Sequence, residues 1–502
     1  MRVWTRVAVI CLLVAGCGGP VLDEGLSLES ASAELDSAQE RSGPVAGIHP
    51  VPNAARLVKE LFPDSPIPWY GPYPENLVAY RGRLYFRVTS DASVPGGLWT
   101  SDGTEAGTVQ VTGAGIPYGL TVAVNRLFFT LDDGVRGNEL WVSDGTAAGT
   151  RLVKDLAPGS GSSSLELLGA NSRGLLFLRV FPGATPELPR AELWRSDGTE
   201  AGTVRVRDLG TGVIGQYAFT TRLVVGDTLF FFDSAQGYGL KLWKSDGTTA
   251  GTAQVYNIHG SSQNAYARDL RAVGNTLYFI VSDYGRGHEV WKSNGTTAGT
   301  ARVESIARVP DTQWIWMLDA IGSDLYYALP NRDRTMQLRR LRTACTGSGC
   351  AQSVATLPNP HASREFATPF INTSAVADGK LFFSLGISSS GPAPLDVQLW
   401  VTDGTSAGTK LLHRPLSLSD EFGSQLYAVG RRVIFTGAST TYGGDLEPWD
   451  STGSVSGTRK LQDIAAGGAS SFARDFTRVG NSLFFVANDG VHGNELWVFP
   501  LE

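Results

Sequence analysis

One twelve-residue motif recurs through most of this 502-residue chain and limits its fold more than any other feature. The fullest copy, ELWVSDGTAAGT, runs from Glu139 to Thr150. The tryptophan of the motif also occurs at Trp99, Trp194, Trp243, Trp291 and Trp400, and in weaker copies at Trp449 and Trp497. The mean period is about 50 residues, which is typical of propellers and solenoids.

Each period also contains a turn followed by an apolar triplet. Nine triplets begin at Leu84, Leu127, Leu175, Leu229, Leu277, Leu325, Leu381, Val433 and Leu483. Each period has four strand-like segments, and in residues 483–487 every position is apolar, so both faces of each sheet should be buried. We therefore expect an all-β fold, a β-propeller of about nine four-stranded blades. Because the sixth unit is degenerate, eight blades with one unit extruded is the alternative.

The two ends of the repeat region complement each other. Residues 56–61, RLVKEL, match residues 151–156, RLVKDL, yet no tryptophan element precedes them. The last unit finishes at the Trp497 strand and lacks the strand that follows in other copies. We therefore expect an N-terminal strand to complete the C-terminal blade, which closes the ring and removes an exposed sheet edge.

Residues 1–16 have the features of a signal peptide. Arg2 and Arg6 precede residues 7–15, an apolar stretch too short to span a membrane. Residues 13–17, LVAGC, resemble the lipobox of bacterial lipoproteins, which implies cleavage before Cys17 and its acylation, with palmitate among the acyl groups. An ordinary signal peptide with an incidental cysteine is the alternative. In bacterial lipoproteins an Asp after the acylated cysteine implies retention at the inner membrane. This position holds Gly18, which implies an outer-membrane lipoprotein of the cell envelope. The sequence leaves open which face of the outer membrane the protein occupies.

Residues 17–50 differ in composition from the repeats. Six acidic residues lie among Ser, Ala and Gly, and no aromatic residue occurs. Such a segment is expected to be a disordered tether with a reach of roughly 30 Å, linking the lipid on Cys17 to the propeller of residues 51–502.

The repeat as a whole is similar to the ELWxxDGT repeat family, whose name describes the motif. The resemblance covers nearly all of residues 51–502. It implies an architecture, and it supplies no catalytic or binding residues.

The recurrent tryptophan and aspartate each allow two interpretations. The tryptophan could stack on a sugar ligand, but its repetition at one strand position favours packing between blades. The aspartate could bind calcium, but the position is held by Asp102, Asp144, Asp197, Asp246, Asn294, Asp403 and Thr452. These side chains can all bond a nearby backbone N–H and fix the turn, whereas Thr is a poor calcium ligand. We predict no metal site and no cofactor, although calcium in some loops stays open.

Two cysteines remain after export, because Cys11 leaves with the signal peptide and Cys17 takes lipid. Cys345 and Cys350 lie in the degenerate sixth unit, where the tryptophan strand and its turn are expected. We predict a disulfide between them that closes the hairpin closed elsewhere by Asp-Gly-Thr.

Charge and histidine content restrict the function. The formal net charge is -6 and the sequence contains no basic block, so we expect no binding to nucleic acid, which depends on contacts between cationic side chains and phosphates. None of the six histidines shows a Ser/His/Asp or zinc-type spacing. The favoured function is a non-catalytic binding or scaffold propeller for an unknown protein or carbohydrate ligand. The alternative is a propeller hydrolase or lyase acting on envelope polysaccharide or peptide, which converging carboxylates or arginines in a central pocket would favour.

Trp316 is a large aromatic residue at a position where the other units have polar residues. Counting six residues back from the turn glycine of each first strand gives Asn76, Arg268, Ser424, Arg474 and, in the sixth unit, Trp316. First strands line the channel of a propeller, so Trp316 is a candidate ligand-binding residue. The alternative is that Trp316 fills space beside the degenerate unit.

Overall fold

The computed structural model describes residues 54–62, 73–89, 95–113, 115–181, 190–211, 221–233, 239–260, 265–283, 287–306, 314–345, 349–391, 393–416, 425–439 and 444–501. The chain divides into residues 1–52 and 53–502, and the described residues all belong to the second unit. Their regular elements are β-strands, β1 to β36. Within these ranges no helix is long and apolar enough to cross a membrane.

The strands form nine four-stranded antiparallel sheets, which are the blades of a propeller. Blade 1 contains β2 (Glu75–Tyr80), β3 (Arg83–Val88), β4 (Gly97–Ser101) and β5 (Val109–Thr112). Blade 2 contains β6 (Tyr118–Ala123), β7 (Arg126–Asp132), β8 (Asn138–Ser143) and β9 (Arg151–Lys154). Blade 3 contains β10 (Ser164–Asn171), β11 (Gly174–Phe181), β12 (Arg190–Ser196) and β13 (Val204–Thr211). Blade 4 contains β14 (Arg222–Val225), β15 (Thr228–Asp233), β16 (Leu240–Ser245) and β17 (Ala253–Ile258).

The next four blades have the same strand order. Blade 5 contains β18 (Ala265–Val273), β19 (Thr276–Asp283), β20 (Gly287–Ser293) and β21 (Ala301–Ile306). Blade 6 contains β22 (Trp316–Ile321), β23 (Asp324–Pro330), β24 (Met336–Arg342) and β25 (Ala351–Leu357). Blade 7 contains β26 (Pro369–Ala377), β27 (Lys380–Ile387), β28 (Asp396–Thr402) and β29 (Lys410–His413). Blade 8 contains β30 (Tyr427–Val429), β31 (Arg432–Gly437), β32 (Glu447–Ser451) and β33 (Thr458–Lys460).

Blade 9 is built from both ends of the repeat region. It contains β34 (Arg474–Val479), β35 (Ser482–Asn488), β36 (Asn494–Pro500) and, as its fourth strand, β1 (Arg56–Lys59). Arg56 pairs with Val498 and Leu57 with Trp497, antiparallel. The expected propeller of nine blades, closed by an N-terminal strand, is therefore confirmed, and the degenerate sixth unit is a full blade.

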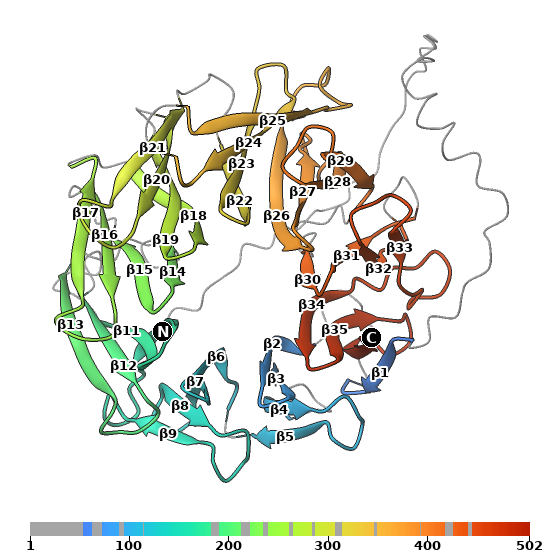
Figure 1. Cartoon of the computed structure of the whole chain (residues 1–502). Coiled ribbons are helices and arrows are strands. Elements are labelled where there is room, and N and C mark those ends of the chain that lie inside the picture. Colours follow the sequence, from blue (N-terminus) through green and yellow to red (C-terminus); the bar gives the residue numbers. More distant parts are fainter. Residues whose placement is uncertain are drawn as a thin grey trace, which may run out of the picture. The chain divides into compact units, whose positions relative to one another are not determined.

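The first strand of each blade lies toward the middle of the ring and the fourth toward its outside. Figure 1 shows β2, β6, β18 and β22 on the inner side and β5, β9, β13 and β17 on the outer side. Within a blade the turn between the first and second strands lies on one face, and in blades 1 to 8 the connection between the third and fourth strands lies on the same face. We call this face the turn face.

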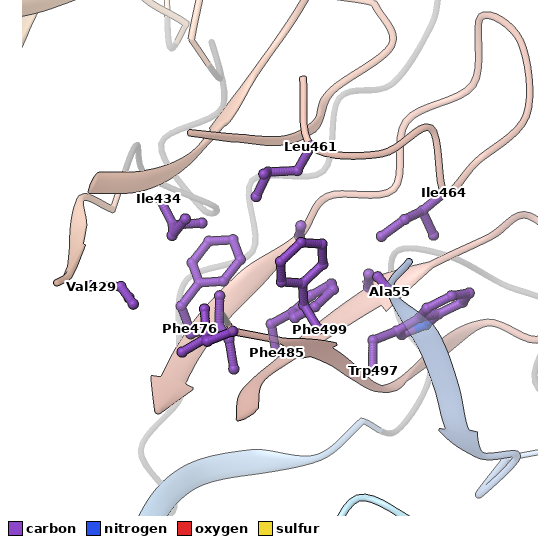
Figure 2. Packing of buried hydrophobic residues seen from close by; sticks show 13 residues of the cluster. Ala55, Val429, Ile434, Leu461, Ile464, Phe476, Phe485, Trp497 and Phe499 are labelled. Carbon is purple, nitrogen blue, oxygen red and sulfur yellow. The ribbon is translucent and has the colours of Figure 1, made fainter. Parts of the chain in front are cut away.

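The core consists of nine clusters, each shared by two consecutive blades. Figure 2 shows the cluster between blades 8 and 9, where Ile434 and Leu461 of blade 8 face Phe476 and Phe485 of blade 9. Burial of both sheet faces explains why every position of residues 483–487 is apolar.

The motif tryptophan packs between blades, as its repetition indicated. In eight blades a phenylalanine lies opposite it on the second strand, in the pairs Phe86–Trp99, Phe129–Trp141, Phe177–Trp194, Phe231–Trp243, Phe279–Trp291, Phe383–Trp400, Phe435–Trp449 and Phe485–Trp497. The Phe231 and Trp243 rings are stacked, with their centroids 6.2 Å apart. The large aromatic thus belongs to the cluster shared with the preceding blade.

Blade 6 replaces this aromatic pair with a polar network. Arg339 stands in the tryptophan register, opposite Tyr327. Arg339 Nη1 donates to Glu304 Oε1 of blade 5 at 2.6 Å, and the Tyr327 hydroxyl donates to the same carboxylate. Burial, followed by the nearby Glu304 charge, raises the pKa of Tyr327. In the degenerate unit, charge-assisted hydrogen bonds therefore take the place of the aromatic pair at the interface between blades 5 and 6.

Candidate ligand-binding site

The Asp-Gly-Thr segments form turns that are held by side-chain hydrogen bonds. In blade 1, Asp102 Oδ1 accepts from the Thr104 backbone N–H at 2.9 Å and from the Thr104 hydroxyl at 2.7 Å. These two bonds hold the pKa of Asp102 below its ordinary value. Thr104 Oγ1 in turn accepts from the backbone N–H of Gly107 at 3.0 Å. The aspartate therefore fixes the turn.

The same bonds recur in five further turns, at Asp144, Asp197, Asp246, Asn294 and Asp403. The second glycine of the motif leaves no room for a side chain, because a Cβ at Gly107 would lie 2.0 Å from Asp102 Oδ1. In blade 8, Thr452 replaces the aspartate, and Ser454 Oγ accepts from the backbone N–H of Gly457 at 3.0 Å, as Thr104 Oγ1 does from Gly107. Among the described residues there is no group of three or more His, Cys, Asp or Glu side chains that could hold a metal ion.

Each turn lies on the blade before it. The Gly145 carbonyl of blade 2 accepts from the Tyr85 hydroxyl of blade 1 at 3.2 Å. Cationic side chains of the preceding blade donate to further turn carbonyls, among them the pairs Gly198–Arg151 at 2.7 Å, Gly247–Arg195 at 3.1 Å and Thr452–Lys380 at 3.1 Å. The turns therefore fasten neighbouring blades together on the turn face.

A disulfide performs this task in blade 6. Cys345 and Cys350 are joined, as the sequence indicated, with their Cα atoms 5.5 Å apart. The Arg342 backbone N–H donates to the Cys350 carbonyl at 3.0 Å and closes the hairpin. Both cysteines pack in the cluster with Tyr278 of blade 5. The disulfide hairpin thus covers the preceding blade as an Asp-Gly-Thr turn does.

Blade 9 has no equivalent turn, because its fourth strand, β1, comes from the other end of the repeat region and no hairpin joins it to β36. A pocket of about 500 Å³ lies at this point, between blades 8 and 9. It is lined by Val429, Gly430, Arg431, Arg432, Asp450, Thr452, Ser456, Gly457, Arg459, Arg478 and Leu501. Val429 and Leu501 also belong to the cluster between the two blades, so the pocket has an apolar floor.

Four arginines make the pocket cationic. Asp450, whose side chain is 2% exposed, pairs with Arg432 at 2.9 Å and with Arg459 at 3.3 Å. Arg431 reaches Asp378 of blade 7 at 3.0 Å, and this ion pair holds the pKa of Asp378 below its ordinary value. Four arginines against these two aspartates leave a formal charge of +2, in a chain whose net charge is -6.

Sequence reasoning did not identify this pocket. Its signals were the loss of the motif aspartate at Thr452 and the adjacent arginines Arg431 and Arg432 after a turn glycine. Arg478 and Leu501 belong to another blade, and no spacing along the chain connects them with Arg459.

Trp316, the residue that the sequence singled out, lies on β22 and does not line this pocket. It is half-buried and packs against the cluster between blades 6 and 7. Trp314, two residues earlier in the chain, is 40% exposed. Its ring lies under the Arg268 guanidinium at 4.9 Å and beside Tyr266 at 6.3 Å.

The strand register corrects one member of the set used to single out Trp316. Tyr80 pairs with Arg83 and Val479 with Ser482, so Gly82 is the second residue of its turn whereas Gly480 is the first. The counterpart of Arg474 in blade 1 is therefore Glu75, not Asn76. Arg268 and Arg474 do align with Trp316, while Ser424 and the acylation candidate Cys17 lie outside the described residues.

No family model matches the chain, and no curated protein matches it. Among solved structures, the propeller domain of the Trilobed protease from Pyrococcus furiosus is similar at 11% identity and a TM-score of 0.34, over 78% of this chain and 99% of that one. A prolyl endopeptidase has 15% identity and a TM-score of 0.39, over 74% of this chain and 52% of that one. A puromycin hydrolase has 14% identity and a TM-score of 0.34, over 74% and 58%. The chain thus spans little more than half the length of the last two, and the similarity carries no activity over to it.

Proposed function

We propose that this protein is a binding propeller that takes an anionic ligand in the pocket between blades 8 and 9. In this proposal lipid on Cys17 anchors the chain to the outer membrane, and residues 18–50 tether the propeller.

The observation that carries the proposal is that four arginines line one concave site with an apolar floor. The guanidinium group is planar, stays charged at all physiological pH values, and offers paired donors that match carboxylate, phosphate or sulfate oxygens. A volume of about 500 Å³ falls within the range of pockets that enclose small ligands.

The state of Asp450 favours binding over hydrolysis at this site. A general base needs a free lone pair near the substrate, but Asp450 is buried and pairs with both Arg432 and Arg459. Among the described lining residues, Thr452 and Ser456 provide hydroxyl groups, and there is no histidine and no carboxylate besides Asp450. The pocket also lies between two blades on the turn face, whereas a central pocket with converging carboxylates or arginines would have favoured the enzyme alternative.

Pyrophosphate titration with the purified exported protein tests the anion site. We expect binding with 1:1 stoichiometry by calorimetry and a rise in the melting temperature. Arg459→Gln and Arg478→Gln should each weaken binding by about tenfold, the effect of losing one hydrogen bond to a charged group.

The matched control is Arg205→Gln on blade 3. Arg205 is 53% exposed and pairs with Glu192, much as Arg459 is 66% exposed and pairs with Asp450. The control should bind like the wild type. Absence of binding by the wild type, or equal loss in the control, would refute the anion site.

The lipid anchor is tested separately. Cells that express the wild-type protein with a palmitate analogue should label it, and Cys17→Ser should abolish both the label and membrane association. Labelling that persists in the Cys17→Ser variant would contradict the anchor and leave the pocket proposal untouched.

A further inference from the structure

The turn contacts of the other blades show what a ligand on blade 8 would meet. The carbonyl groups of the turns accept hydrogen bonds from several places on the preceding blade, and two of these places matter for blade 8. One is the start of the second strand, where Lys380 of blade 7 donates to the Thr452 carbonyl at 3.1 Å. The other is the start of the fourth strand, where Arg151 of blade 2 donates to the Gly198 carbonyl at 2.7 Å.

Blade 8 has an arginine at both places. Arg432 pairs with Val429 as Lys380 pairs with Ala377, so the two cations occupy the same register. Arg459 follows the turn of blade 8 as Arg151 follows the turn of blade 2, one residue before the residue opposite the motif tryptophan. Both arginines line the pocket. Blade 8 therefore has the receiving side chains for a turn that blade 9, with its split fourth strand, does not provide.

We propose that the pocket receives an acidic β-turn of a partner protein, docked on blade 8 as the Asp-Gly-Thr turns dock on the preceding blades. This inference rests on the proposed function, since it names the class of anionic ligand. Arg432 and Arg459 donate to carbonyl oxygens of the turn, and the floor of Val429 and Leu501 contacts its small side chains.

The charge of the pocket selects an acidic turn over a neutral one. At other turns, one or two cationic side chains of the preceding blade donate to turn carbonyls: Arg81 beside the neutral Tyr85, Arg151 with Lys154, Arg195 with Arg207, and Lys380. The pocket adds Arg431 and Arg478 to the two receiving arginines, and it has a formal charge of +2 after ion pairing. Carboxylates on the turn offset this charge, which gives specificity for acidic turns.

The probe is a fluorescently labelled cyclic peptide of residues 101–108, SDGTEAGT, which has the sequence of a native turn and two carboxylates. We expect the wild-type protein to bind it, and pyrophosphate to compete for the same site. Arg459→Gln should weaken peptide binding by about tenfold, and Arg205→Gln should leave it unchanged. A cyclic peptide with Asn and Gln in place of the two acids should bind at least tenfold more weakly.

The outcomes separate the two proposals. If pyrophosphate binds but the cyclic peptide neither binds nor competes, the anion site stands and the acidic turn is wrong. If the neutral peptide binds as well as the acidic one, the charge argument is wrong. If neither pyrophosphate nor peptide binds, both proposals fail. Melting curves of Arg459→Gln and Arg205→Gln show that a loss of binding is not a loss of folding.

Discussion

The carboxylate of Glu495 accepts the backbone N–H of Phe62 at 2.6 Å, across 433 positions of the chain. It also accepts the N–H of Leu61 at 2.9 Å, directly after the strand that closes the ring. Glu139 and Glu447, at the same place in the motif, each accept two backbone N–H groups beyond the fourth strand of their own blades. The glutamate at the first position of the motif therefore holds, by two hydrogen bonds, the segment that follows the fourth strand of a blade.

Removal of the Glu495 carboxylate should weaken ring closure. Glu495→Ala leaves two buried N–H groups without acceptors, at about 1–3 kcal/mol each, so we expect a loss of about 2–6 kcal/mol of unfolding free energy. Chemical denaturation measures this loss. Glu105→Ala, on an exposed turn, is the control and should change stability by less than about 0.5 kcal/mol.

Stability should depend on pH through the same residue. Burial raises the pKa of Glu495 to about 8 and that of Glu447 to about 7, from an ordinary value of 4.5. A carboxyl group with a raised pKa in the folded state contributes stability that is fully present below pH 4.5 and is lost as the pH rises through the folded-state pKa. Melting temperatures should therefore fall between pH 5 and pH 8, and Glu495→Gln should reduce the slope. An identical pH profile in Glu495→Gln would show that this group does not titrate as described.

Deletion of residues 51–62 should open the ring. It removes β1, exposes the edge of β36, and leaves the Glu495 carboxylate without its donors, so we expect aggregation or loss of cooperative unfolding. Deletion of residues 18–50 is the matched control and should melt like the full protein. A truncated propeller that melts at the control temperature would mean that β1 contributes nothing to closure.

The second glycine of the turn motif should tolerate no side chain. A Cβ at Gly149 would lie 2.1 Å from Asp144 Oδ1, so Gly149→Ala should cost about 1–3 kcal/mol. Gly161→Ala is the control, because its nearest neighbour would lie at 3.8 Å. Equal unfolding free energies for the two variants would contradict this steric account.

Trp316 and its exposed neighbour should behave differently. Trp316→Ala removes a half-buried ring from the cluster between blades 6 and 7 and should cost about 3 kcal/mol. Trp314→Ala, at an exposed ring, should cost less than about 1 kcal/mol. Neither residue lines the arginine pocket, so both variants should bind pyrophosphate normally. Unchanged melting of Trp316→Ala, together with lost binding of a ligand, would instead make Trp316 a ligand contact.

The fold could be predicted because its determinants are local and repeated. The period, the apolar triplets and the match between residues 56–61 and 151–156 each lie within a few residues of sequence, and together they indicate nine blades and their closure. The disulfide followed from Cys345 and Cys350 replacing a turn of known position.

The candidate site could not be predicted in the same way, because it depends on contacts between blades. Arg459 and Arg478 meet only when blades 8 and 9 pack, and the pocket exists where a turn is missing. The hydrogen bonds of Glu495 could not be predicted either, because its partners are Leu61 and Phe62 at the other end of the repeat region. Counting from Gly82 placed Asn76 one position out of register, because a turn glycine can be the first or the second residue of its turn.

The closure of the ring by β1 also has a mechanical consequence. A pull on the N-terminal segment first reaches Ala55, whose backbone N–H and carbonyl bond to the Gln462 side chain at 2.6 and 3.1 Å, and then the short ladder in which Arg56 pairs with Val498. Gln462 follows the last strand of blade 8 and Val498 lies in blade 9, and these two blades also line the pocket. A ligand that bridges blades 8 and 9, as we propose, would therefore act on the blades that bear the load and would raise the force at which the ring opens.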